Sequence, residues 1–270
     1  MFASDGQQLK ADNKKTYLFD SLLFCLILLG FCYLLYKGTE SLGYNWQWFR
    51  IPGFIFSFNE GKLVAGPLLE GLAVTLKITG LSFILTFVIG LGTAIMRLSN
   101  SFTAKGLSRI YLEIIRNTPL LIQLFFIYFV VAPIIGINGF WASVIALSLF
   151  EGAYASEIFR AGITSIDRGQ WEAAYSLGGD KKFAYLNVVL PQAVPRIAPP
   201  LAGQAIALVK DSALVSTVAI YDLTMQGQSI ISETFLTFEI WFVVAAIYLS
   251  ITLLLSWVLD TAARRFKSEW

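Results

Sequence analysis

Long apolar runs separated by short polar segments dominate the pattern of hydrophobic and polar positions along the chain. A run of about twenty apolar residues is long enough to cross a bilayer as a helix. Residues 117–150 contain no charged side chain over 34 positions, too many for one span, and Pro133 and Gly136 mark a turn within them. The pattern predicts an all-α integral membrane protein with six transmembrane helices, at about 18–36, 69–96, 109–132, 139–160, 196–220 and 238–259.

The first run and the segment after it each have two interpretations. A cleaved signal peptide is the rival for 18–36, but its length and the absence of a small-residue cleavage site after it favour a retained helix. Residues 37–67 are rich in Trp and Phe, which is typical of the membrane–water interface. A surface that receives an extracytoplasmic partner is the alternative for this loop.

Composition supports membrane insertion and excludes other classes. Hydrophobic residues make up 56% of the 270 positions and charged residues 14%, against about 25% in soluble proteins. A net charge of +2 without basic clusters gives no case for nucleic-acid binding. Cys25 and Cys32 both lie in an apolar run, where packing is expected instead of metal or redox chemistry.

Basic residues predict the orientation. With six spans and both termini on one side, fourteen Lys and Arg residues fall on that side and three, Lys37, Arg50 and Lys62, on the other. The side richer in Lys and Arg is the cytoplasmic side. Both termini and the polar segment 163–191 are therefore expected in the cytoplasm.

The polar segment 163–191 reads as a helix–turn–helix. Glu172 suits the first turn of a helix, where its charge complements the free N–H groups. Ala173 and Ala174 would give a small face that a partner approaches closely, and Gly178 is a helix stop. A docking site for another protein and a helix lying on the membrane surface are both compatible with this pattern.

A second short helix is expected over 181–189, ended by Pro191. The whole segment reads E-A-A, three residues, G, nine residues, Val188, one residue, L-P. This resembles the cytoplasmic EAA loop of ATP-binding-cassette (ABC) importer permeases, with Val188 in place of the usual Ile. The stretches 115–121, 157–163 and 209–214 resemble the polar amino-acid uptake branch of that family, and the resemblance covers about 68–260.

The resemblance implies a type I ABC importer permease core of five helices over 68–260, with one additional N-terminal helix, in the inner membrane of a bacterium. The additional helix and aromatic loop would occupy 18–67, with cytoplasmic tails at 1–17 and 261–270. Implied partners are two copies of an ABC ATPase, a second permease subunit, identical or homologous, and an extracytoplasmic substrate-binding protein. The residues implied to couple to the ATPase are Glu172, Ala173, Ala174, Gly178, Leu190 and Pro191.

The chain itself is not expected to be an enzyme. Its only Gly-Lys dipeptide, Gly61-Lys62, lacks the rest of a phosphate-binding loop, so ATP hydrolysis belongs to a partner chain. No cofactor and no metal are expected.

Ionisable groups inside the spans mark the candidate pathway, because such groups are costly in a membrane. Glu151 lies midway along its span and would accept a substrate ammonium group, or form a buried ion pair with Lys210. Glu157 and Arg160 are expected to form a surface pair, and Arg116 to snorkel to the interface. The candidate pathway residues are Glu151, Tyr154, Lys210, Asp211, Ser212, Asn117, Thr118 and Gln123.

An acid, a base and several amides suit a zwitterionic solute. Together with the resemblance this predicts uptake of a polar amino acid, first of the glutamate, aspartate or glutamine type and second of the basic type. An ATP-independent ion-coupled carrier or channel for small zwitterions is the alternative.

Overall fold

The computed structural model describes residues 19–31, 33–34, 36–38, 43–59 and 62–268, and divides the chain into two units, Met1–Gln47 and Trp48–Trp270. In the first unit an apolar helix runs over Phe19–Gly38, and its described side chains are exposed. A helix is thus present near 18–36, as expected, and its retention in the mature protein stays a prediction. The predicted tail over 1–17, and Cys32, lie outside the described residues.

The second unit begins with short helices and strands within residues 37–67, where the sequence predicts a loop. A 3₁₀ turn at Trp48–Arg50 and helix α2 (Ile51–Ile55) lead into strand β1 (Phe56–Asn59), which pairs antiparallel with β2 (Lys62–Ala65). Phe56 pairs with Ala65 in the register of this hairpin. Within 37–67, therefore, the described residues include an aromatic helix and a two-stranded hairpin.

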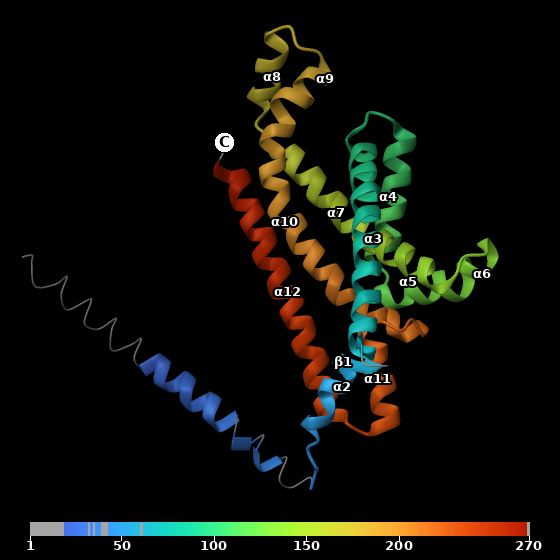
Figure 1. The fold of residues 1–270 in the computed structure, drawn as a ribbon. Coiled ribbons are helices and arrows are strands. Elements are labelled where there is room, and N and C mark those ends of the chain that lie inside the picture. The colour runs from blue at the N-terminus through green and yellow to red at the C-terminus, as the bar shows by residue number, and fades with distance from the viewer. Residues whose placement is uncertain (1–18, 32, 35, 39–42, 60–61, 269–270) are drawn as a thin grey trace, which may run out of the picture. The chain divides into compact units, whose positions relative to one another are not determined.

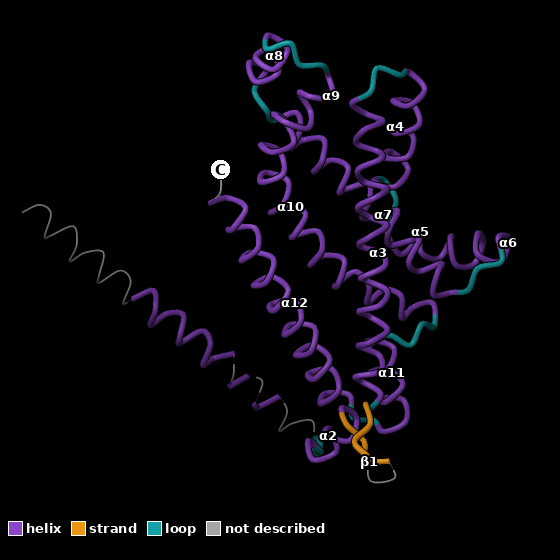
Figure 2. Tube along the Cα trace, turned by 45° about the horizontal axis from the view of Figure 1, so that its top comes forward, coloured by secondary structure: helices purple, strands orange, loops and turns teal. Residues whose placement is uncertain are grey.

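Long helices form the rest of this unit (Figure 1). Those long and apolar enough to cross a membrane are α3 (Pro67–Leu98), α7 (Gly139–Thr164), the helix over Lys181–Val218 and α12 (Thr237–Ser268). Helix α12 continues beyond residue 259, so much of the predicted tail at 261–270 is helical. Helix α11 (Leu223–Thr234) lies at the end of this unit that also holds β1 and α2 (Figure 2).

The third predicted span, 109–132, is not one straight helix. Helix α4 (Phe102–Arg116) ends at a break, and α5 (Leu120–Phe126), a π-helical turn (Ile127–Val131) and α6 (Ala132–Ile135) continue at 107° to it. Pro119 explains the break, because a proline disfavours helical geometry at the preceding residue and has no N–H to donate. Figures 1 and 2 show α5 and α6 turning away from α4.

Helices α3 and α7 pack against each other through small residues. A Cβ atom added at Gly90 would lie 2.8 Å from the Ala155 Cβ and 3.2 Å from the Gly152 carbonyl oxygen. Nearby, the buried Ser82 hydroxyl donates to the Val144 carbonyl oxygen at 3.3 Å. Close approach of small residues with polar groups bonded across the interface is how helices associate in lipid.

Candidate functional site

Helix α8 (Arg168–Ser176) occupies the first half of the predicted helix–turn–helix. Asp167 caps it by accepting a hydrogen bond from the Gly169 N–H at 2.7 Å. Gly178 adopts a left-handed conformation (φ +79°), and the Gly179 N–H donates to the Ala174 carbonyl oxygen at 3.1 Å. The predicted helix stop at Gly178 is confirmed, because this conformation and hydrogen bond are those of a helix C-terminus.

Two expectations for α8 are wrong. Glu172 lies in its second turn, and the N-terminal carboxylate is that of Asp167, because the helix begins at Arg168, four residues before Glu172. Ala174 is buried within the chain, since α8 packs against residues 184–189, and of the two alanines only Ala173 remains exposed. The small face for a partner is therefore narrower than predicted.

Pro191 does not end the second helix. Helix α9 (Lys181–Phe183), a π-helical segment (Ala184–Val189) and α10 (Leu190–Asp211) run on through Leu190 and Pro191. Pro191 lies in the first turn of α10, where the missing N–H of a proline costs no hydrogen bond. The wide π-helical turn before it relieves the clash between the proline ring and the preceding carbonyl group. Gln170 and Gln192 join α8 to α10 through a 3.2 Å hydrogen bond.

The helical hairpin of α8, α9 and the π-helical segment is anchored at its base and carries several exposed apolar side chains. Trp171 and Tyr185 form an edge-to-face pair with ring centroids 4.8 Å apart, packed against a buried cluster that includes Ile166, Val189 and Ala193. Its exposed side carries apolar groups, Leu177 (84% exposed) above all, with Tyr175, Phe183 and Leu186. Exposed apolar groups on a firmly held element are typical of a protein contact.

Glu151 is the most buried ionisable group of the candidate pathway, at 1% exposure in α7. The Gln204 side chain of α10 donates a hydrogen bond to its Oε2, and the Asp211 carboxyl group lies close enough to interact with it. Lys210 is exposed, and the ion pairs of the described residues do not include one between Lys210 and Glu151. The pairing with Lys210 is therefore wrong, because successive helical residues point about 100° apart and Asp211 takes the inward direction.

Three other predicted pathway residues stabilise the bend after α4. The Asn117 Nδ2 donates to the Glu113 carbonyl oxygen at 2.7 Å, and the Thr118 hydroxyl donates to the Ile114 carbonyl oxygen at 2.8 Å. The buried Gln123 Nε2 donates to the carbonyl oxygens of Ile115 (2.7 Å) and Thr118 (3.0 Å). These bonds satisfy carbonyl groups that lose their helical donors at the break.

The two remaining pathway residues are also placed within the bundle. The half-buried Tyr154 packs its ring 5.2 Å from that of Phe150, measured between centroids. The Ser212 hydroxyl is buried and donates to the Val209 carbonyl oxygen at 2.8 Å. A substrate role for these residues stays a prediction.

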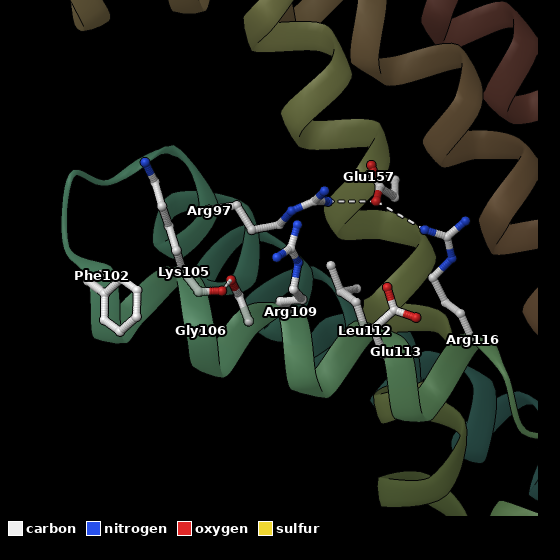
Figure 3. Close-up of a pocket in the computed structure, with 10 residues that line it drawn as sticks. Arg97, Phe102, Lys105, Gly106, Arg109, Leu112, Glu113, Arg116 and Glu157 are labelled. Carbon is white, nitrogen blue, oxygen red and sulfur yellow. Dashed lines mark hydrogen bonds and ion pairs between the residues drawn. The ribbon is translucent and has the colours of Figure 1, made fainter.

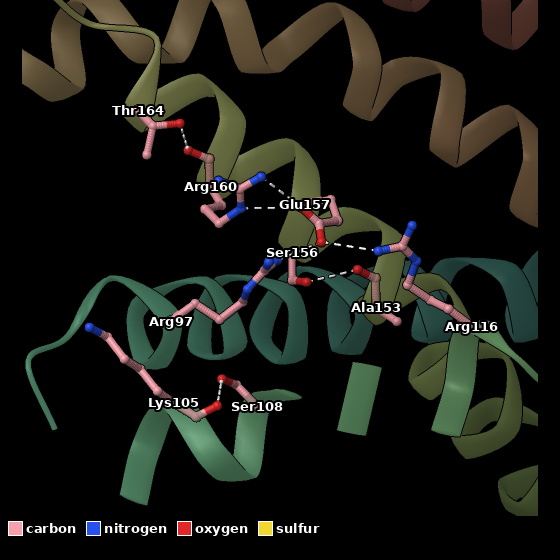
Figure 4. A network of polar contacts seen from close by, with 9 residues as sticks. All are labelled: Arg97, Lys105, Ser108, Arg116, Ala153, Ser156, Glu157, Arg160 and Thr164. Carbon is pink, nitrogen blue, oxygen red and sulfur yellow. Dashed lines mark hydrogen bonds and ion pairs between the residues drawn. The ribbon is translucent and has the colours of Figure 1, made fainter. Parts of the chain in front are cut away.

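Sequence reasoning missed a cluster of arginines around Glu157 (Figures 3 and 4). The predicted pair with Arg160 is confirmed, at 3.1 Å, but the same carboxylate also binds Arg97 at 2.6 Å and Arg116 at 3.1 Å. Arg116 therefore pairs across helices, because the ends of α3, α4 and α7 converge on Glu157. The available signal was that all four residues lie near the same predicted membrane surface.

The chain is similar in sequence and in fold to known transport proteins. Residues 86–268 match the family described as "Binding-protein-dependent transport system inner membrane component". The chain is 38% identical to the glutamine transport system permease protein GlnP of Escherichia coli over 74% of this chain and 93% of that protein. It is 36% identical to the arginine transport system permease protein ArtQ of Bacillus subtilis, over 75% and 93%.

A third relative is the L-cystine transport system permease protein TcyL of Bacillus subtilis, 33% identical over 73% of this chain and 86% of that protein. Among solved structures, one described as "Crystal structure of an amino acid ABC transporter with histidines" has a TM-score of 0.69 and 41% identity, covering 74% of this chain and 94% of that one. The match spans most of each relative. The chain therefore belongs to the family of inner membrane components of binding-protein-dependent transport systems, and is a multi-pass permease subunit of an ABC importer, not an enzyme.

Proposed function

We propose that this chain forms the pathway for a polar amino acid together with a second permease subunit, identical or homologous. Permeases of this family work with an ATPase and a substrate-binding protein. We assign two copies of the ATPase to the complex, one on each permease. The relatives belong to transport systems for glutamine, arginine and L-cystine. All three are polar amino acids, and this supports the substrate class.

The observation that carries the substrate assignment is the buried carboxyl group of Glu151. An ionisable group at mid-span is costly unless it has a function or a partner, and the described residues offer it no basic side chain. Gln204 and Asp211 of α10 add a polar amide and a second carboxyl group at the same place. These groups match a substrate ammonium group, and the exposed Lys210 on the same helix is assigned to its carboxylate.

Coupling follows from the continuity of the chain between the hairpin and this site. The helix over Lys181–Val218 runs without a large break from the hairpin to Gln204 and Asp211. Trp171 and Tyr185 fix α8 to the start of that helix. Closure of the ATPase dimer therefore displaces the hairpin as a rigid lever, and α10 carries the movement to the contact with Glu151. Glu172, Ala173 and Leu177 form the proposed ATPase contact.

The test is uptake by the complex reconstituted in vesicles with its ATPase and binding protein, screened with glutamine, glutamate, aspartate, arginine and cystine. We expect one of them to accumulate only with internal ATP and to stimulate hydrolysis. Glu151→Gln lowers uptake about tenfold or more, the equivalent of roughly 1.4 kcal/mol. The matched control Glu233→Gln, at an exposed acid of α11, leaves uptake unchanged.

Coupling has its own readout, the hydrolysis stimulated by substrate-loaded binding protein. Leu177→Ala removes the most exposed apolar side chain of the hairpin and is expected to abolish this stimulation. Leu249→Ala, at an exposed apolar residue in the middle of α12, serves as the control. Uptake that proceeds without ATP, or that none of the five amino acids supports, contradicts the proposed function.

A further inference from the structure

The proposed function leaves unused a basic pocket at the end of the bundle that also carries α8 (Figure 1). The pocket lies between the end of α3, the length of α4 and α7, and its volume is about 590 Å³ (Figure 3). Four basic side chains line it, Arg97, Lys105, Arg109 and Arg116. Only two acidic side chains, Glu113 and Glu157, face them.

The charges within this basic pocket do not balance. Glu157 is already shared by Arg97, Arg116 and Arg160, so one negative charge faces three positive ones. Within the described part of the chain, Lys105 and Arg109 form no ion pair. The pocket therefore holds surplus positive charge on exposed side chains, directed at a space that an anion can enter.

The surroundings place this pocket at a membrane surface. The side of α4 opposite its basic residues carries Leu107, Ile110 and Ile114, each more than half exposed and spaced to share one helix face. Phe102 lines the pocket and is 92% exposed, as aromatic residues are at the level of lipid headgroups. An anion bound beside Phe102 is therefore expected at the headgroup level of the bilayer.

We propose that this pocket binds the phosphate of an anionic phospholipid headgroup. Lys and Arg side chains between helices at a membrane surface attract such headgroups, and arginine binds phosphate oxygens with two parallel hydrogen bonds. Lys105 and Arg109 supply the free charge, while Arg97 and Arg116 are held in place by Glu157. The lipid is favoured over free phosphate because the exposed Phe102 ring lines the same pocket and suits the headgroup level of a bilayer. This site does not depend on the substrate or on the ATPase.

The experiment is native mass spectrometry of the purified full chain, titrated with phosphatidylglycerol or phosphatidylcholine, without ATP or amino acid. We expect phosphatidylglycerol to bind preferentially. The double variant Lys105→Gln/Arg109→Gln weakens this binding roughly thirtyfold, from about fivefold for each basic side chain. Lys105→Arg/Arg109→Lys retains the charge and the binding, which separates charge loss from misfolding.

The matched control is Arg168→Gln/Lys182→Gln, which removes two exposed basic side chains at the same end but outside the pocket, and it keeps the binding. Equal weakening in both double variants overturns the site. Displacement of the lipid by millimolar inorganic phosphate, with no preference for phosphatidylglycerol, overturns the lipid assignment. A pocket variant that keeps the lipid but loses the ATPase on co-purification makes the pocket a protein contact, and the proposal is then wrong. Transport is not measured, so failure of the proposed function leaves this result unaffected.

Discussion

Glu157 is the residue on which three helices of the bundle meet. Its carboxylate binds Arg97 of α3, Arg116 of α4 and Arg160 of its own helix. We expect Glu157→Gln to lower the free energy of unfolding by roughly 1–2 kcal/mol, since single exposed ion pairs contribute about 0–1 kcal/mol and three are lost here. Thermal unfolding in detergent measures this. Glu113→Gln is the control, because Glu113 forms no ion pair among the described residues. Equal melting temperatures for the two variants contradict the prediction.

Asp222 predicts a pH dependence of stability outside the spans. It caps α11 by accepting a hydrogen bond from the Met225 N–H at 2.9 Å, and burial raises the pKa of its carboxyl group from 3.8 to about 6. The folded state therefore keeps a proton that the unfolded state releases between about pH 4 and pH 6. The free energy of unfolding falls as pH rises through this window, by at most about 3 kcal/mol.

Asp222→Asn removes this contribution and keeps the cap, because an amide oxygen also accepts the Met225 N–H. We expect the variant to be as stable as the native chain near pH 4 and more stable near pH 7. Melting temperatures over pH 4–8 test this. A difference between the two proteins that does not change with pH contradicts it.

Single-residue features were only partly predictable from the sequence. An acid at the middle of a predicted span singled out Glu151, and the structure shows it buried and bonded to Gln204. The alternative pairing of Glu151 with Lys210 was wrong, because the neighbour of Glu151 depends on the rotation of α10 about its axis. Hydrophobic periodicity does not fix that rotation when polar residues are adjacent.

At the scale of elements, the bend between α4 and α5 depends on one buried amide. We expect Gln123→Leu to destabilise the chain by about 1–3 kcal/mol, because it leaves the Ile115 and Thr118 carbonyl groups without this donor in a buried place. Asn117→Ala removes a similar bond at an exposed position and costs about 0.5 kcal/mol or less. Chemical unfolding measures the free energy of unfolding of both variants. Equal losses in the two would show that burial of the Gln123 amide is unimportant.

Elements were predicted best where the pattern is long and local. Apolar runs located the first, second, fourth and sixth spans within a few residues, and Gly178 located the turn between α8 and α9. The helix of the fifth span begins at Lys181, well before the predicted residue 196. The 107° bend at Pro119 and the continuation through Pro191 were missed for one reason. Whether a proline ends, bends or joins a membrane helix depends on which neighbours satisfy the freed carbonyl groups, and those are distant in sequence or in an unusual turn.

At the scale of the whole molecule, the family decides what the hydrophobic pattern left open. Six apolar runs are equally compatible with an ion-coupled carrier, and membership in the importer family decides against that alternative. The relatives match about three quarters of the chain. The helix over Phe19–Gly38 and the strands β1 and β2 precede the family match, which begins at residue 86. The resemblance therefore gave no expectation for their packing.

The orientation of the molecule is the remaining prediction at this scale. Fourteen basic residues against three predict that the helical hairpin of α8 and α9 lies in the cytoplasm. We expect Leu177→Cys, in a chain with Cys25 and Cys32 replaced by Ser, to react with a membrane-impermeant maleimide in inverted vesicles but not in intact cells. Tyr221→Cys, half exposed near the start of α11, is the matched position on the other side and reacts in intact cells. Labelling of Leu177→Cys in intact cells would reverse the topology, and it would remove the hairpin from the compartment where ATP is hydrolysed.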